Sequence, residues 1–465
     1  MAPSTSPPVQ QAHPPPPELP PHVRGVLERL WLAGYAAYAV GGGVRDWLLG
    51  RAPVDWDVAT GALAEQTAAL FEGARIEGAF GTVRVPRPPG VVDITTFRRD
   101  HRYADHRRPD AVTFTDDVRL DLLRRDFTVN AIAWGRAPAE TSADWLDPTG
   151  GLDDLRRRLL RAVGEPRARF DEDALRLLRA VRLATELRFD IEAATRRALE
   201  AAADDIGYVS AERVRAELAR IVAVDEPSRG LRLLQETGLL RRVLPELDEQ
   251  LGVEQGKPIG GDLWQHTLAT VDAAAALAGS DAVVRWAALL HDVGKPATAA
   301  DGHFHGHHEV GAGMARDVLA RLRAPRHETD LVVRLVRWHM VMYEQRWSDA
   351  AIRRFIRKVG VDLLPRLWLL READNLGSGV DPDAGGLAEL RARVEAQLAA
   401  GVPLGLDELA VDGHDLLREL GVPRGPIIGT LLGRLLDSVI ADPARNRRDI
   451  LLADARAWLA SERAP

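Results

Sequence analysis

Apolar positions change their spacing along the chain, and the change separates two kinds of structure. Between residues 21 and 150, helical segments are interleaved with short apolar or alternating runs typical of strands, namely YAAYAV, VDWDVAT, GTVRV and VVDITTF. From residue 151 onward the spacing becomes helical, as in 171–187 and 211–222, and strand signals disappear. The pattern predicts an α+β protein, with a small N-terminal α/β head on a mixed sheet and a long all-α body.

Shifts in composition divide the chain further. Residues 1–20 are rich in proline and predict a disordered tail. The head is expected over 21–150 and a helical neck over 151–255. Histidine and tryptophan become frequent in 256–385, and a last helical segment is expected over 386–465.

Overall composition narrows the classes of function. The 465 residues carry a formal net charge of −7 and no cysteine. A uniformly basic nucleic-acid-binding coat is therefore excluded, although a local basic channel is not. Without cysteine, disulfides and thiolate catalysis are excluded, and a metal site must use histidine and carboxylates. The N-terminus has no signal-peptide pattern and no apolar run is long enough to span a bilayer, so a cytoplasmic protein is expected.

The densest candidate chemistry lies between Gly41 and Asp57. Three consecutive glycines, including Gly42 and Gly43, allow backbone amides to approach a polyphosphate, and Arg45 follows in the first turn of a predicted helix. Asp55 and Asp57 flank a tryptophan in a strand-like run. At a period of two, both carboxylates face one side of the sheet.

Two adjacent carboxylates repel each other, and binding of Mg²⁺ is a good reason to place them together. Asp93, in another strand-like run, is a candidate third carboxylate. The alternative interpretation is a solvated sheet edge. The glycine loop upstream favours the metal site.

These motifs carry a resemblance that extends over roughly residues 25–225. The segments GGGVRD, VDWDVAT, VDITTF, YADHRRPD, LLRRDFTVNAIAW, DPTGGLDDL and EPRARFDEDALRLLRAVRLATEL, followed by AERVRAELARI, occur in order. They resemble the CCA-adding enzyme and bacterial poly(A) polymerase family. This family is the class II branch of the DNA polymerase β-like nucleotidyltransferases.

The resemblance implies roles for particular residues. Asp55 and Asp57 would hold Mg²⁺ for attack of an RNA 3′-hydroxyl on the α-phosphate of a nucleotide, with Asp93 as the third catalytic carboxylate. The nucleotide-binding residues that it implies are Gly42, Gly43, Arg45, Arg125, Asp126, Asn130, Asp173, Arg176 and Arg179.

Asp173 and Arg176 have a spacing that allows base recognition. They stand at i and i+3, which places them on one face of a continuous predicted helix. A carboxylate and a guanidinium can together pair with the Watson–Crick edge of cytosine or adenine. The alternative is an ordinary salt bridge between Glu172 and Arg176. The resemblance favours base recognition.

A charged loop between Phe97 and Arg107 is expected to be mobile. In the family, a loop at this place helps to switch specificity from C to A, and enzymes that add only two cytidines resemble this pattern with the loop shortened. The loop has full length in this sequence. This argues against a CC-only enzyme and leaves addition of CCA or of A alone open.

A second constellation of metal-ligand residues lies in the helical body. It consists of His266, the adjacent pair His291 and Asp292, and Asp374. Nitrogen and carboxylate ligands together suit a divalent transition metal such as Mn, Ni, Co, Fe or Zn. An isolated histidine is more often packed or solvated, but an ordered set of such residues indicates a site. A bound ion of this kind could activate water for phosphoester hydrolysis.

This set resembles the HD phosphohydrolase superfamily over residues 260–380. The resemblance makes His308 and His339 candidates for further ligands, whereas His303, His305 and His307 are expected at the surface or in contact with phosphate. Lys295 could bind a substrate phosphate or be solvated. Bacterial tRNA nucleotidyltransferases that carry an HD domain are associated with 2′,3′-cyclic phosphodiesterase and phosphatase activities.

The leading expectation is an enzyme that adds C, C and A to the tRNA 3′ end from CTP and ATP without a nucleic acid template. The C-terminal residues 412–440 resemble family helices that lie along tRNA, although a plain helical bundle is the alternative. A-only or poly(A) addition is the nearest alternative function. A phosphohydrolase with a degenerate RNA-binding head is a more distant one. No protein partner and no membrane association are indicated.

Overall fold

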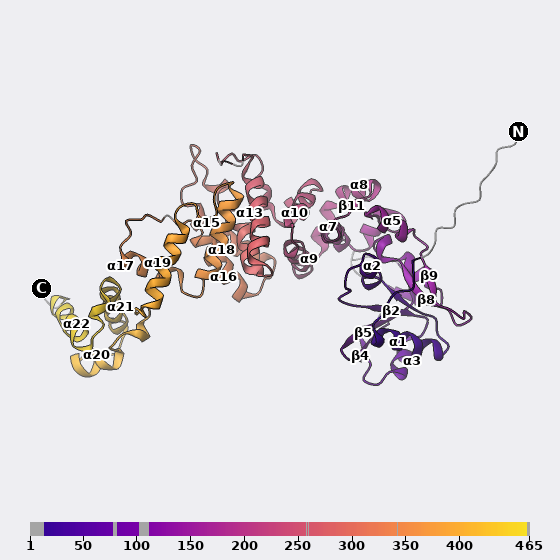
Figure 1. Cartoon of the computed structure of the whole chain (residues 1–465), viewed down its shortest axis with the longest axis horizontal. Helices are drawn as coiled ribbons and strands as arrows, with labels where there is room; N and C mark the ends of the chain where they lie inside the picture. Colours follow the sequence, from indigo (N-terminus) through magenta and orange to yellow (C-terminus); the bar gives the residue numbers. More distant parts are fainter. Residues whose placement is uncertain are drawn as a thin grey trace. The chain divides into compact units, whose positions relative to one another are not determined.

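The computed structural model describes residues 14–77, 81–101, 111–256, 258, 260–341 and 343–462. The chain forms two compact units, of which the first contains residues 1–224 and 229–243. The second contains residues 225–228 and 244–465. Figure 1 labels the helices and strands of both units.

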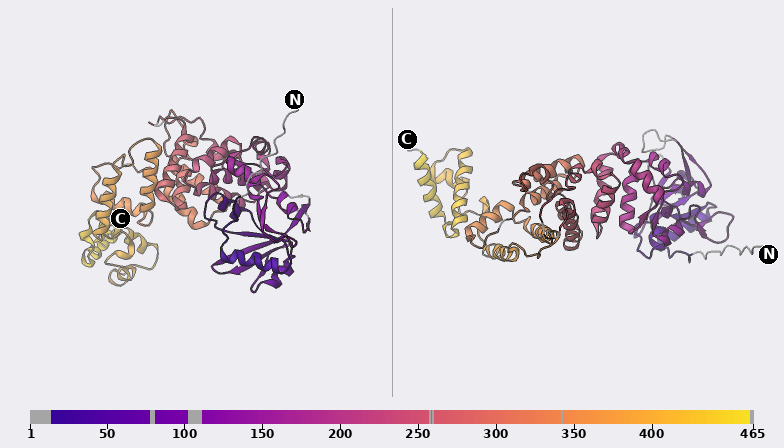
Figure 2. Two further views of the ribbon diagram at one scale, coloured as in Figure 1. Left: turned by 45° about the vertical axis from the view of Figure 1, so that its right-hand side comes forward. Right: turned by 90° about the horizontal axis from the view of Figure 1, so that it is seen from above.

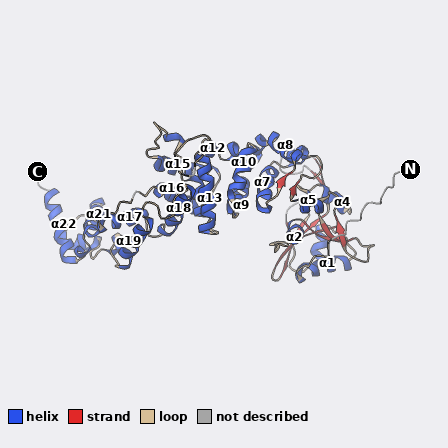
Figure 3. Cartoon of the chain, turned by 45° about the horizontal axis from the view of Figure 1, so that its top comes forward, coloured by secondary structure: helices blue, strands red, loops and turns tan. Residues whose placement is uncertain are grey.

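The head in the first unit is built on a seven-stranded mixed sheet. Its strand order is β3-β4-β5-β2-β1-β8-β9, in which β2 and β5 are parallel and the other neighbours are antiparallel. The strands are β1 (Ala37–Val40), β2 (Asp57–Thr60), β3 (Arg75–Glu77), β4 (Thr82–Arg87), β5 (Gly90–Thr96), β8 (Ala133–Arg136) and β9 (Asp144–Leu146). The expected mixed sheet is confirmed, and its strands are among those drawn in red in Figure 3.

Short helices connect and cover the strands because the apolar positions between them recur at helical spacing. One core cluster joins Tyr38 and Val40 of the sheet to Phe97 and Leu122, all of them buried. The helices of the head are α1 (Pro21–Leu32), α2 (Gly42–Leu48), α3 (Ala64–Leu70), α4 (Val118–Leu123) and the 3-10 turn η1 (Thr128–Asn130). Strands β6 (Arg98–His101) and β7 (Ala111–Phe114) form a separate antiparallel ribbon.

The neck is almost entirely helical. A helix predicted as continuous over 171–187 is instead broken, because Asp173 has extended backbone angles (φ −147°, ψ 105°) between two helices. The elements are α5 (Gly151–Arg157), β10 (Leu159–Leu160), α6 (Pro166–Glu172), α7 (Leu175–Leu187), β11 (Asp190–Ile191), α8 (Ala193–Ala201), η2 (Ala203–Tyr208), α9 (Ala211–Ala223), α10 (Pro227–Glu236) and α11 (Leu240–Val243).

The second unit is all-α, as expected for the body. Helix α13 packs against both α14 and α18, and the three C-terminal helices α20, α21 and α22 share a separate apolar cluster, drawn in yellow tones in Figure 2. The helices are α12 (Pro245–Asp248), α13 (Leu263–Ala278), α14 (Ala282–Leu290), η3 (Pro296–Thr298), α15 (His307–Arg321), α16 (Arg326–Trp338), α17 (Asp349–Val359), α18 (Leu364–Gly377), α19 (Leu387–Ala399), η4 (Leu406–Glu408), α20 (Gly413–Leu420), α21 (Pro426–Ala441), η5 (Pro443–Arg445) and α22 (Arg448–Glu462).

The N-terminal proline-rich segment departs in part from the expected disordered tail. Pro17 and Leu19 are buried, and the indole Nε1 of Trp145 donates a hydrogen bond to the carbonyl of Pro14 at 2.8 Å. Residues 14–20 therefore pack on the head, because Leu19 and the prolines offer apolar surface. Residues 1–13 lie outside the described part of the chain. Among the described residues, no helix is long and apolar enough to cross a membrane.

Candidate functional sites

The paired aspartates of the head lie at one edge of the sheet. Asp57 is the first residue of β2 and stands opposite Asp93 of β5 in the parallel register. Asp55 precedes the strand, and Asp55 and Asp57 are exposed on either side of the buried Trp56. The alternation inferred from the sequence is thus present, although only Asp57 belongs to the strand.

The glycine loop packs directly on these aspartates. Gly41 follows β1 with a φ of 78°, a conformation that a side chain disfavours. A Cβ atom at Gly41 would lie 3.2 Å from Oδ2 of Asp57 and 3.3 Å from Nη1 of Arg125. A Cβ atom at Gly43 would lie 2.6 Å from the carbonyl oxygen of Asp55. Glycine is required here because backbone and carboxylates occupy the space of a side chain.

Electrostatics at this edge favour a bound cation. Desolvation raises the pKa of Asp57, and the carboxylates of Asp93 and Asp55 raise it further, while Arg125 opposes the shift. Asp93 is paired with Arg84, whose Nε lies 3.0 Å from Oδ1. A bound Mg²⁺ would offset the repulsion among these carboxylates, and carboxylate oxygens are ligands that Mg²⁺ prefers.

Arg45 is engaged by protein groups rather than directed to open solvent. Its guanidinium is buried, with Nη2 2.7 Å from Oδ1 of Asp46 and Nη1 2.7 Å from Oδ1 of Asn130. These bonds use three of the five N–H groups of Arg45, so contact of Arg45 with a triphosphate, as inferred from the sequence, does not require loss of these partners. Arg45 is thus ion-paired with Asp46, the next residue of α2.

A half-buried ion pair joins the head to the neck. Arg179 of α7 donates from Nε and Nη2 to Oδ2 of Asp126, at 2.9 and 2.6 Å. Asn130 donates from Nδ2 to Oδ1 of the same carboxylate at 3.1 Å. Burial opposes ionisation of Asp126, but Arg179 and the Asn130 hydrogen bond outweigh it and hold its pKa below the usual range. Asn130 bonds both Asp126 and Arg45, so it links the ion pair to the glycine loop.

The two residues expected to recognise the base are near each other along the chain but do not share one helix. Asp173 lies in the break between α6 and α7, and Arg213 donates to its Oδ2 at 2.8 Å. Arg176 lies in the first turn of α7 and bonds Oε2 of Glu172 at 2.5 Å. The salt bridge considered as the alternative is thus present. The sequence pattern had not indicated Arg213.

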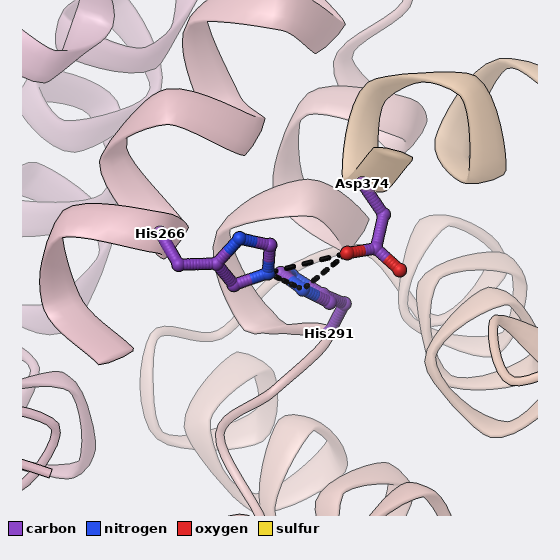
Figure 4. A group of neighbouring side chains, drawn as sticks. All are labelled: His266, His291 and Asp374. Carbon is purple, nitrogen blue, oxygen red and sulfur yellow. Dashed lines mark hydrogen bonds and ion pairs between the residues drawn. The ribbon is translucent and has the colours of Figure 1, made fainter. Parts of the chain in front are cut away.

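The second unit brings the predicted HD residues together. His266 projects from α13, His291 follows the end of α14, and Asp374 lies on α18. The Nε2 atoms of His266 and His291 are 3.0 Å apart, and His266 Nε2 is 3.2 Å from Oδ1 of Asp374. Figure 4 shows the three side chains converging on one point. All three are buried.

A second group adjoins the first through Asp292. Oδ2 of Asp292 lies 3.3 Å from His266 Nε2 and 3.1 Å from His291 Nε2. Its other oxygen, Oδ1, lies 3.3 Å from His307 Nε2 and 3.5 Å from His339 Nε2. Asp292 thus faces two groups of donors, each compact enough to hold a metal ion.

All four histidines point the same ring nitrogen at the centre. Each Nδ1 lies within hydrogen-bond distance of a backbone carbonyl, a pairing that places the proton on Nδ1 and the lone pair on Nε2, the nitrogen that can bind a metal. The pairs are His266 with Gly377 at 3.0 Å, His291 with Ala288 at 2.8 Å, His307 with Phe304 at 2.8 Å, and His339 with Val336 at 2.7 Å.

Charges around the centre keep its ligands in the binding form. Burial lowers the pKa of His291 to about 4, against the opposing effect of Asp292, so this imidazole is neutral at physiological pH. Asp292 is held ionised despite its burial by the positive charge of Lys295, whose Nζ lies 2.6 Å from Oδ2. The donor set of imidazole nitrogen and carboxylate oxygen fits divalent transition metals.

The structure corrects the assignment of His307 and His308. His307 is buried and points to the centre, whereas His308 is half-buried and lies outside both donor groups, with its ring 5.8 Å from that of His307. Adjacent residues of a helix diverge by about 100°, so only one of them can face the site. The candidate ligand is therefore His307, while His339 lies where it was expected.

A pocket of about 380 Å³ opens beside Asp292 and Asp374. Lys295 and Arg371 contribute positive charge to its wall. His303 and His305 line it as exposed residues whose rings stack 5.4 Å apart. A pocket that combines buried metal-ligand residues with cations at its wall suits a phosphorylated substrate.

Comparisons with known proteins agree with this division into sites. Residues 37–161 match the model described as poly A polymerase head domain, and residues 188–251 match the probable RNA and SrmB-binding site of polymerase A. Residues 263–378 match the HD domain.

Several characterised relatives are similar. A CCA-adding enzyme of Geobacillus thermodenitrificans is 43% identical over 227 residues, and this similarity spans 49% of the chain and 55% of that protein. An A-adding tRNA nucleotidyltransferase of Deinococcus radiodurans is 35% identical, over 86% of the chain and 91% of that protein. A CC-adding tRNA nucleotidyltransferase of Thermus thermophilus is 37% identical, over 86% and 89%.

Among solved structures, the Bacillus stearothermophilus CCA-adding enzyme in complex with CTP is similar along nearly the whole chain. The two are 29% identical, the TM-score is 0.69, and the match covers 96% of this chain and 99% of that one.

Proposed function

Since the chain belongs to the CCA-adding enzyme and bacterial poly(A) polymerase family of nucleotidyltransferases, we propose that it adds C, C and A to the 3′ end of tRNA from CTP and ATP. The observation that carries the proposal is the edge of the head sheet, where Asp57 stands opposite Asp93 and beside the glycine loop. The relatives named above include CCA-adding, A-adding and CC-adding proteins, so the product is the point to be tested.

Residues of the head and neck would have separate roles in nucleotide transfer. Asp55 and Asp57 would hold Mg²⁺, which when bound supplies Lewis-acid stabilisation of a phosphoryl group. Asp93 adds negative charge across the strand pair, and the amides of Gly42 and Gly43 are available for the triphosphate. Asp126 orients Arg179, and Asp173 with Arg176 is proposed to contact the base.

The charged loop expected to switch specificity bears on the choice between products. Residues 102–107 of this loop lie outside the described residues, but β6 and β7 on either side form an antiparallel ribbon. Its full length in the sequence supports addition of A as well as C. A-only addition remains the alternative, supported by the similarity to the Deinococcus protein.

The test uses three tRNA transcripts that end before CCA, after the first C, and after CC. Each is incubated with Mg²⁺ and with CTP, ATP or both, and products are separated by length. With both CTP and ATP present, the proposal expects that all three transcripts are extended to CCA and that no further nucleotide is added. Addition of A to the CC-ending transcript alone would replace it with A addition, and products that stop at CC would identify CC addition.

A second activity is supported by the donor groups around Asp292. We propose metal-dependent hydrolysis of terminal RNA phosphates, including 2′,3′-cyclic phosphates. The residues that would hold the ions are His266, His291, Asp292, Asp374, His307 and His339, and a bound ion would supply activated water. Lys295 and Arg371 lie at the pocket wall, where they can neutralise the charge of a substrate phosphate.

Hydrolysis is tested with a short RNA that ends in a 2′,3′-cyclic phosphate. Protein stripped of metal is reloaded with Mn²⁺, Ni²⁺, Co²⁺, Fe²⁺ or Zn²⁺ in turn, and the RNA termini are analysed. We expect that the protein loaded with at least one of these metals hydrolyses the cyclic phosphate. If the cyclic terminus persists with every metal that the protein binds stoichiometrically, this activity is refuted.

A further inference from the structure

A second pocket in the all-α unit is separate from the one at Asp292. It has a volume of about 240 Å³ and lies where the end of α16 meets α17. The two pockets share no lining residue, although Trp338 of this pocket directly precedes His339. The lining residues are Trp338, Trp347, Ala351, Arg354, Phe355 and Lys358.

One face of α17 supplies most of this lining. Ala351, Arg354, Phe355 and Lys358 recur at i, i+3, i+4 and i+7, which is the spacing of a single helical stripe. Trp347, from the segment before the helix, lies 6.0 Å from the ring of Phe355 at 56°. Ala351 contributes only a methyl group to the pocket wall.

The cations of the pocket have no protein partners, in contrast to their neighbours on the same helix. Arg353 bonds the carbonyl of Ile440 at 2.6 Å, and Arg357 is paired with Asp437 at 2.6 Å. Within the described parts of the chain, Arg354 and Lys358 make no ion pair or hydrogen bond, and both are exposed.

The acidic residues closest in sequence do not neutralise the pocket. Asp349 is paired with Arg393 at 2.9 Å, and Glu344 is paired with Arg346. The pocket therefore combines half-buried tryptophans with two uncompensated positive charges.

We propose that this pocket binds one unstacked nucleobase of single-stranded RNA, with Arg354 and Lys358 contacting the flanking phosphates. Aromatic side chains beside cations are the usual means of holding single-stranded nucleic acid. The pocket is smaller than typical small-molecule sites of roughly 300–1,000 Å³, so it suits one ring system with its backbone outside. The inference does not depend on which nucleotides the head adds.

The spacing of the cations favours an RNA segment over a free nucleotide. Arg354 and Lys358 lie four residues apart, which is about 6 Å along the helix axis. They can therefore contact successive phosphates of one strand, whereas a nucleoside monophosphate offers a single phosphate group. The same pocket chemistry would also accept a free nucleotide, and the experiment separates the two sources.

Binding is measured with the full-length chain by fluorescence anisotropy of a labelled single-stranded hexauridine RNA. The double variant Arg354→Glu and Lys358→Glu is expected to bind about tenfold more weakly. The slope of log affinity against log salt should decrease by up to about 1.4, since each phosphate contact to a single strand contributes about 0.7. An abasic RNA of equal length should bind wild type about tenfold more weakly, because stacking on the tryptophans is lost.

The matched control reverses two other exposed arginines of this unit, Arg316→Glu and Arg326→Glu. This control changes the net charge by the same amount as the double variant of the pocket, and it should retain most of the wild-type affinity for hexauridine. Equal loss in the control, or equal binding of the abasic RNA, would overturn the proposal. Competition by uridine monophosphate as complete as that by RNA would reassign the pocket to free nucleotides.

A positional measurement complements the binding assay. Hexauridine with 5-iodouridine at one position is photocrosslinked to the wild-type chain, and the modified peptides are mapped. Crosslinks are expected between residues 338 and 358. Crosslinks confined to the head and neck would place the RNA elsewhere and overturn the proposal.

Discussion

At the scale of single residues, the pairing of charges decides what each functional side chain can do. Arg45 and Arg179 were both expected at the nucleotide, yet both are held by protein groups. Arg179 neutralises the half-buried carboxylate of Asp126, so it stabilises the fold as well as being a candidate for nucleotide binding.

Replacement of Arg179 by methionine should lower the free energy of unfolding by about 2 kcal/mol, because the half-buried carboxylate of Asp126 would lose two charge-assisted hydrogen bonds. The contribution of the pair is expected to be present at neutral pH. It should be lost as pH falls below the ordinary value of about 3.9, since the pKa of Asp126 is lowered in the folded state. Denaturant unfolding at several pH values measures this.

A double-mutant cycle separates this pair from general disruption of the neck. Adding Asp126→Asn to the methionine variant removes the unpaired charge and should recover part of the loss. Strictly additive losses would show that the two side chains do not stabilise each other.

A second comparison at this scale concerns the adjacent histidines at the start of α15. His307→Ala should reduce the amount of metal bound per chain, because His307 faces Asp292. His308→Ala, the matched control, should bind as much metal as wild type. Metal content after dialysis, measured by mass spectrometry, distinguishes the variants, and equal retention by both would remove His307 from the ligand set.

At the scale of elements, close helix packing positions the ligands of the second unit. Gly377, the last residue of α18, approaches α13 so closely that a Cβ atom would lie 2.7 Å from the amide nitrogen of Thr270. Its carbonyl also holds Nδ1 of His266. The distance between these two helices therefore determines the distance between His266 and Asp374.

Gly377→Ala should weaken metal binding although every ligand is unchanged, because α13 and α18 must separate to admit the methyl group. The control is Gly313→Ala in α15, where a Cβ atom meets nothing within 4 Å. That variant should bind metal as tightly as wild type, and its fold should be unchanged or slightly stabilised, since alanine is the better helix former. Isothermal titration with Mn²⁺ measures the metal affinity of the two variants, and unchanged affinity in Gly377→Ala would contradict this account.

Another element-scale feature is the proline-rich segment before α1. Trp145 bonds the carbonyl of Pro14 and stacks on Trp47 of α2 at 6.1 Å. The segment therefore supports the helix that follows the glycine loop.

At the scale of the whole molecule, the two candidate sites belong to different compact units, since Asp55 lies in the first and His291 in the second. Each unit has its own buried core, so loss of one site does not require the other to change.

Reciprocal inactivation is therefore expected. Asp55→Ala should reduce nucleotide addition by at least a hundredfold and leave hydrolysis of a cyclic-phosphate terminus intact. His291→Ala should do the reverse. Both activities are measured on the same protein preparations, and loss of both in either variant would show that the sites are not independent. Retention of normal addition by Asp55→Ala would refute the assignment of the head site.

Local sequence was sufficient to predict much of this protein. Periodicity predicted the mixed-sheet head and the all-α body, because apolar spacing follows directly from helix and strand geometry. Alternation around Trp56 predicted that Asp55 and Asp57 share a face, and the ordered histidines predicted that His266, His291 and Asp374 meet. These features depend on residue type and on short-range spacing, which the sequence carries explicitly.

Tertiary structure alone decided the remaining features. Sequence spacing suggested one helix through Asp173, but contacts with Arg213 accompany a break there. The resemblance to the HD superfamily favoured His308, but the start of α15 turns His307 toward Asp292. Sequence spacing did not indicate that Arg45 bonds Asn130, which is distant in sequence. In each case the deciding partner comes from a distant segment, and packing in three dimensions determines which distant groups meet.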